Sequence, residues 1–183
     1  MAKHKYVKDY KLVHSVDDRG RMHTSAEYAG ELFTFCAPPE QVRQQGIRAA
    51  VACAVGWACW LGSLFLNTGA MRCFYISLPY AFTALPLWKL SSSIVTALTV
   101  KPPMYRRQSH QVSMFYPPAA LWCAALPAVS LVGLAVTAAL GKGNLVMQDG
   151  IFALCGAILV ACACFCFSLR KSFVTEPQEK RGD

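Results

Sequence analysis

Four long apolar segments constrain this 183-residue chain more than any other feature, because each is long enough to cross a lipid bilayer as a helix. Between Glu40 and Glu176 the sequence contains a single acidic residue, Asp149. Backbone polar groups in hydrocarbon must find partners within their own segment, so these runs are predicted to be helices. The sequence therefore predicts an all-α membrane protein, a four-transmembrane-helix bundle over residues 46–169. Its helices are expected at about 47–66, 73–90, 117–140 and 151–169.

The lysines and arginines are distributed asymmetrically about these segments, and this distribution predicts how the chain is oriented. With both termini inside, sixteen of the eighteen fall on cytoplasmic segments, and only Arg72 and Lys142 fall on outer loops. We therefore predict a multi-pass protein, integral to the plasma membrane, with cytoplasmic N- and C-termini and a basic tail at residues 170–183. The anionic inner leaflet of the lipid bilayer is its first expected partner. No nucleic-acid partner is predicted, because the sequence lacks a basic cluster with stacking aromatics.

The outer loops, about 67–72 and 141–150, are short, so the four helices are expected to form two antiparallel hairpins. Small residues recur at helical spacing in three of the segments, which favours close helix packing and leaves little room for a wide pore. The clearest of these positions are Ala52, Gly56, Ser63, Ala120, Ala124, Ala128, Ala157 and Ala161.

The second apolar segment differs from the others because it contains Pro79 and Pro86, seven residues apart and hence near one face. Each proline removes a backbone hydrogen bond and kinks a helix. Transporters build substrate sites where helices are broken, so Pro79, Tyr80 and Pro86 are candidate lining residues of a solute path. A kink that serves packing alone is the other interpretation.

Residues 1–45 are polar and show the alternating period of strands. One run covers residues 10–16, a turn signal follows at 17–20, and a second run covers 21–28. A short third strand is expected at 31–35, which predicts a small cytoplasmic β-hairpin or three-stranded module. This module either caps its own bundle or docks a partner. The candidate partner-docking residues are Tyr10, Leu12, Val16, Tyr28, Phe33 and Phe35.

Nine cysteines are many for a chain of this length. Cys155, Cys162 and Cys166 are spaced to share one face of the last helix, and a soft metal such as Cu(I) prefers such thiolates. Cysteine is also a small residue that is readily buried. We expect packing, with no cofactor and no metal, and keep a membrane thiol or metal protein as a minor alternative.

Motifs of known enzymes are absent from the sequence, which contains no His-Glu-x-x-His, no Gly-x-Ser-x-Gly and no phosphate-binding loop. The chain is therefore predicted not to be an enzyme. Its expected role is that of an accessory, scaffold or regulatory subunit that contacts a membrane-protein partner or a second copy. The alternative is a small oligomeric transporter or channel for a neutral or anionic solute, since no carboxylate within the apolar segments is available to couple transport to protons.

Overall fold

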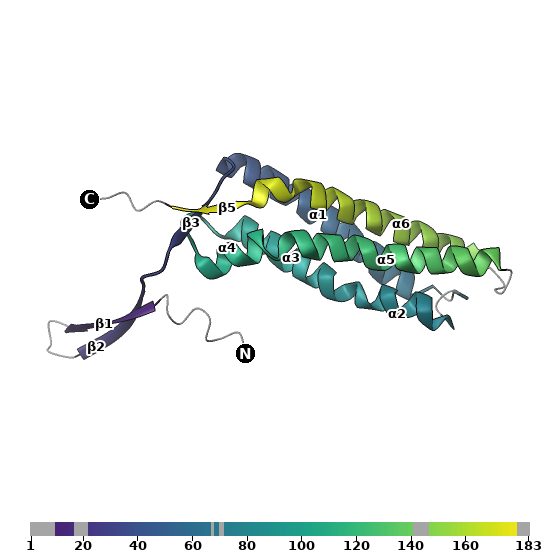
Figure 1. Cartoon of the computed structure of the whole chain (residues 1–183), viewed down its shortest axis with the longest axis horizontal. Coiled ribbons are helices and arrows are strands. Elements are labelled where there is room, and N and C mark those ends of the chain that lie inside the picture. The colour runs from purple at the N-terminus through teal and green to yellow at the C-terminus, as the bar shows by residue number, and fades with distance from the viewer. Residues whose placement is uncertain (1–9, 17–21, 67, 70–71, 141–146, 179–183) are drawn as a thin grey trace.

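The computed structural model describes residues 10–16, 22–66, 68–69, 72–140 and 147–178, and it is mostly helical. Four helical segments are long and apolar enough to cross a membrane, which confirms that part of the expected fold. They lie side by side in an elongated bundle (Figure 1). In chain order they are α1 (Pro39–Leu64), α2 with α3 (Phe74–Phe82 and Ala84–Thr99), α5 (Tyr116–Ala139) and α6 (Met147–Ser168).

Two helices extend beyond the apolar runs at the end of the bundle where α1 begins, which we call the inner end. Pro39 opens α1 at a position where its missing N–H costs nothing, eight residues before the predicted start. Residues 40–46 contain no proline, so the helix continues into the apolar run. At the same inner end, α3 continues to Thr99 and stops before the Pro102–Pro103 pair.

Small residues permit close helix packing at two positions, Gly46 and Gly156, that were not among the predicted ones. A β-carbon added at Gly46 of α1 would lie 2.7 Å from Leu98 of α3. Likewise, one added at Gly156 of α6 would lie 3.0 Å from Leu131 of α5. Side chains at these two positions would force the helices apart, so glycine permits their close approach.

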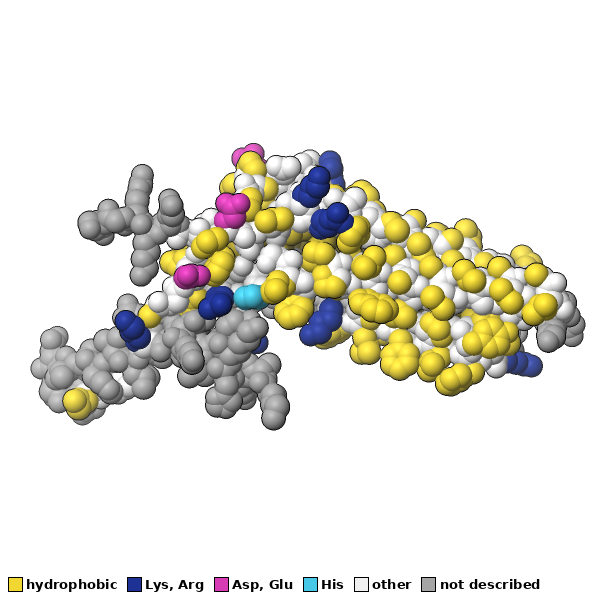
Figure 2. Space-filling view, viewed as in Figure 1, with side chains coloured by type: hydrophobic (Ala, Val, Ile, Leu, Met, Phe, Trp, Pro, Cys, Tyr) yellow, Lys and Arg dark blue, Asp and Glu magenta, His cyan; other side chains and the backbone are white. Residues whose placement is uncertain are grey.

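Large apolar side chains cover the outside of the bundle as well as its interior (Figure 2). A helix that is hydrophobic all round belongs either to the core of a large protein or to a membrane. The exposed set includes Leu61, Leu85, Trp88, Leu121, Trp122, Val129, Val132, Val136 and Leu154.

The N-terminal strands form the predicted hairpin. β1 (Tyr10–Val16) pairs antiparallel with β2 (Met22–Tyr28), and the register runs from Tyr10 opposite Tyr28 to Val16 opposite Met22. The predicted turn at residues 17–20 lies outside the described residues.

The third strand, β3 (Leu32–Phe35), does not join this hairpin, and the expectation of one N-terminal three-stranded sheet was wrong in that respect. Instead β3 is the central strand between β4 (Met104–Tyr105) and β5 (Thr175–Pro177). Only three residues separate β3 from α1, so the strand is held at the inner end of the bundle. The loop after α3 and the segment after α6 end there too, and they supply its partners.

Candidate functional site

The predicted kink lies between α2 and α3, at Thr83. Pro79 is inside α2, and Pro86 is in the first turn of α3. Side chains of α1, of α5 and of the junction residue Thr83 bond the backbone carbonyls around the break. The Trp60 indole donates to the carbonyl of Tyr80 (3.0 Å), the Thr83 hydroxyl to that of Pro79 (3.1 Å) and the Ser130 hydroxyl to that of Ile76 (3.0 Å). The break is therefore tied to its neighbours on α1 and α5.

Tyr80, the central candidate of the predicted solute path, is 1% exposed. Its hydroxyl lies 2.9 Å from the Ser63 hydroxyl of α1, and its ring packs on Phe152 of α6 with centroids 4.7 Å apart. Tyr80 thus fills the space between these helices. Pro79 and Pro86 are half-buried. The lining role of these three residues stays a prediction, and their contacts are those of a structural joint.

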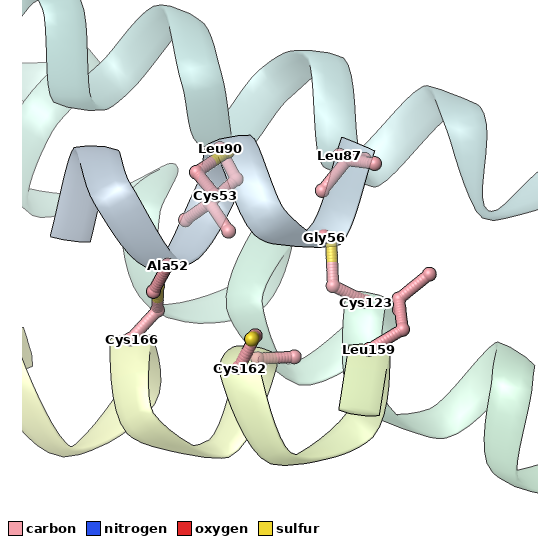
Figure 3. Close-up of a pocket in the computed structure, with 10 residues that line it drawn as sticks. Ala52, Cys53, Gly56, Leu87, Leu90, Cys123, Leu159, Cys162 and Cys166 are labelled. Carbon is pink, nitrogen blue, oxygen red and sulfur yellow. The ribbon is translucent and has the colours of Figure 1, made fainter. Parts of the chain in front are cut away.

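A small cavity lies between the helices (Figure 3), nearer the inner end of the bundle than the kink. Pro79, Tyr80 and Pro86 do not line it. Four thiols surround it, from Cys53 of α1, Cys123 of α5, and Cys162 and Cys166 of α6. Cys155, the third member of the predicted α6 face, is not among the lining residues. The cavity measures about 10 Å³, which is the space of a single water molecule. It is too small for a solute in this conformation.

Two of these thiols have polar neighbours within the protein. The Cys53 sulfur lies 3.2 Å from the Ser91 hydroxyl, and the Cys166 thiol lies 3.8 Å from the carbonyl of Ala49. Over the described part of the chain, no group of three or more Cys, His, Asp or Glu side chains is arranged to hold a metal ion. The contacts made by Cys53 and Cys166 are those of small packing residues.

The inner end of the bundle is closed by a structure that we call the inner cap, made of β3, β4, β5, α4 (Arg106–Ser113) and the short 3₁₀ helix η3 (Leu169–Phe173). The Ser109 hydroxyl of α4 lies 2.6 Å from that of Thr175. Phe173 packs on the ring of Tyr116, with centroids 4.7 Å apart. Three segments distant in sequence therefore meet in the inner cap.

Phe33 and Phe35, two of the predicted docking residues, belong to β3 and hence to the inner cap. Both are half-buried, and Phe35 packs against the core of the bundle. The structure therefore separates them from the other four candidates, which lie on the hairpin. For Tyr10, Leu12 and Val16 it describes the backbone alone, and the register places them opposite Tyr28, Ala26 and Met22 respectively.

Tyr28 fastens the base of the hairpin to the inner cap. Its hydroxyl accepts the backbone N–H of Arg106 (3.1 Å) and donates to the carbonyl of Glu31 (2.9 Å). Its ring meets that of Tyr105 edge-on, with centroids 4.6 Å apart. Beyond this contact the hairpin extends away from the bundle (Figure 1). Sequence reasoning did not identify Tyr105, because nothing in its local pattern distinguishes it from other loop tyrosines.

Fold and site together define a helical protein with four helices able to span a membrane, a compact inner cap and a projecting hairpin. No protein-family model, curated protein or solved structure matches the chain.

Proposed function

We propose that this chain is an integral membrane protein that works without catalysis, as an accessory, scaffold or regulatory subunit that docks a membrane-protein partner through its β1–β2 hairpin. In this proposal the four apolar helices span the plasma membrane, and the inner cap, the hairpin and both termini are cytoplasmic. The observation that carries the proposal is the hairpin itself, which is fastened at Tyr28 and extends away from the bundle.

An isolated two-stranded hairpin is at best marginally stable in water. Its two edges carry backbone N–H and C=O groups that a further strand can pair with, and alternate side chains supply specificity in this mode of binding. Of the four alternate positions 10, 12, 14 and 16, three are apolar and His14 is polar, a composition that suits a face that becomes buried against a partner. Their burial on docking would supply the stability that the hairpin lacks alone.

The tightly packed bundle is compatible with a supporting role. The backbone at the kink is bonded by neighbouring helices, and the cavity near the four thiols holds no more than one water. Transport of a neutral or anionic solute through an oligomer stays the alternative, and no contact in the described bundle favours it over docking.

Orientation is tested by cysteine labelling with a membrane-impermeant maleimide on intact cells. Cys36 follows β3 and is exposed at the inner end, whereas Met147 is exposed at the opposite end of the bundle. We expect a Met147→Cys variant with Cys73 replaced by alanine to be labelled from outside, and Cys36 only after permeabilisation. Labelling of Cys36 on intact cells would contradict the proposed orientation.

The pH of this labelling matters because the thiolate is the reacting form. Partial burial raises the pKa of the Cys36 thiol, and the hydrogen bond and negative charge of Glu176 raise it further. A raised pKa leaves less thiolate at neutral pH, so the reaction needs a mildly alkaline buffer. A Glu176→Gln variant is expected to react a few-fold faster at the same pH, since the carboxylate charge is removed.

The docking role is tested by gentle extraction of the full chain, carrying an affinity tag, from its own membranes. We expect one protein to co-purify in a fixed stoichiometry and to be identified by mass spectrometry. Recovery of the chain alone after chemical crosslinking in intact membranes would contradict the proposal.

A further inference from the structure

Contacts between three helices fix a common level near the inner end of the bundle. The Tyr116 hydroxyl at the start of α5 donates to the carbonyl of Cys166 near the end of α6 (2.7 Å). The Cys166 thiol in turn lies 3.8 Å from the carbonyl of Ala49 in α1. Ala49, Tyr116 and Cys166 therefore lie side by side, although they are far apart in the sequence.

Basic side chains surround the bundle close to this level. Arg48 precedes Ala49, and Arg170 follows Cys166 by about one helical turn. On α3, the Lys89 ammonium lies 5.9 Å from the ring centroid of Phe115, the residue before Tyr116. We call Arg48, Lys89 and Arg170 the inner collar. All three are exposed, and Figure 2 shows Lys and Arg side chains where the apolar body meets the inner cap.

Aromatic rings accompany the collar. The Arg170 guanidinium lies 4.0 Å from the ring centroid of Phe167, a cation–π contact like that between Lys89 and Phe115. Trp88 and Trp122, on α3 and α5, are 67% and 57% exposed. Exposed tryptophans next to lysine and arginine are typical of the headgroup region of a bilayer.

The distance from the collar to the far end of the bundle matches a bilayer. At a rise of 1.5 Å per residue, the helices extend outward from this level by about 24 Å in α1, about 30 Å in α6 and about 36 Å in α5. The hydrocarbon core of a bilayer is about 30 Å thick. A bundle inserted to this depth places the collar among the headgroups of the inner leaflet.

We propose that the inner collar binds the headgroups of anionic phospholipids and so fixes the depth of the bundle in the membrane. This inference rests on the membrane insertion proposed above. Within the described chain, no carboxylate forms an ion pair with Arg48, Lys89 or Arg170. Their charges are thus available to the phosphate oxygens of lipid headgroups.

The test compares lipids added to the full chain in a neutral detergent, with the thermal unfolding midpoint as the readout. Phosphatidylglycerol is expected to stabilise the wild-type protein at a lower concentration than phosphatidylcholine. Each collar charge near an anionic surface is expected to change binding about fivefold. The triple variant Arg48→Gln, Lys89→Gln, Arg170→Gln should therefore lose the preference for phosphatidylglycerol while keeping its midpoint in detergent alone, because all three side chains are exposed.

A matched control removes three exposed cations that lie farther inward, through Arg43→Gln, Lys101→Gln and Arg107→Gln. This variant should keep the lipid preference, and an equal loss would overturn the collar. Equal stabilisation by inorganic phosphate would also overturn it, because a free anion would then suffice. Equal effects of the two lipids reject the collar and leave insertion standing. If neither lipid stabilises the protein, the proposed insertion fails.

Discussion

Replacing Tyr80 with alanine is expected to lower the free energy of unfolding by about 3–5 kcal/mol, the range found when large buried aromatics are truncated. Tyr80 is buried between α1 and α6, against Ser63 and Phe152, and truncation would leave a cavity beside the helix break. The measurement is reversible unfolding in a mixed detergent, followed by far-ultraviolet circular dichroism. Because two helices pack on one ring, the loss is expected to affect the whole bundle.

Two further variants separate the contribution of the Tyr80 hydroxyl from that of its buried ring. Tyr80→Phe removes the hydroxyl alone and should cost about 1 kcal/mol. Tyr75→Ala removes a tyrosine from the same helix that is 56% exposed and bonded to Thr137, and it should cost much less than Tyr80→Ala. If Tyr80→Ala is as stable as the wild type, the ring does not fill the core, and the predicted lining role for Tyr80 would be favoured instead.

Introducing carboxylates on the apolar positions of the hairpin is expected to reduce capture of the partner at least tenfold. The double variant Leu12→Glu, Val16→Glu would place two charges in an interface that excludes water. Loss of a single hot-spot side chain costs about 2 kcal/mol or more, which is more than tenfold in affinity. The readout is the amount of partner recovered with the tagged chain from native membranes.

The control for this pair is Ser15→Glu, Ser25→Glu. In the register Ser15 lies opposite His23 and Ser25 lies opposite Val13, so both belong to the set of positions that alternates with Leu12 and Val16. The same added charge on the other set of positions should leave capture within about twofold. Both variants should keep the unfolding midpoint of the wild type, because the hairpin lies outside the packed bundle. Equal loss in the control would mean that added negative charge, and not the docking face, determines the result.

The helices were predictable because an apolar composition sustained over some twenty residues is a strong signal for a membrane-spanning helix. That signal does not depend on the identity of any single residue. The hairpin was predictable because Tyr10, Leu12 and Val16 fall on alternate positions of one short run, and a turn signal follows that run.

The pairing of β3 could not be predicted in the same way. A four-residue strand offers two edges, and its sequence does not encode which segments will reach them. Its partners β4 and β5 contain two and three residues, too few to show any period. Their position follows from where α3 and α6 end, and the lengths of those helices depend on tertiary packing.

The chemistry of the candidate site was predictable only in part. The prolines indicated a broken helix correctly, but Ser63 and Phe152, which hold Tyr80, come from other helices and are invisible in its local pattern. The α6 spacing placed Cys162 and Cys166 together, yet the other two thiols at the cavity come from α1 and α5. Such groupings depend on how helices face one another across the bundle.

Docking through the hairpin is tested most directly by a photo-crosslinking amino acid placed at position 12 of the full chain in native membranes. Illumination should give one discrete adduct between this chain and a protein of different mass, and the same reagent at position 15 should give little or none. No adduct from position 12, or equal adducts from both positions, would contradict a docking face on the hairpin.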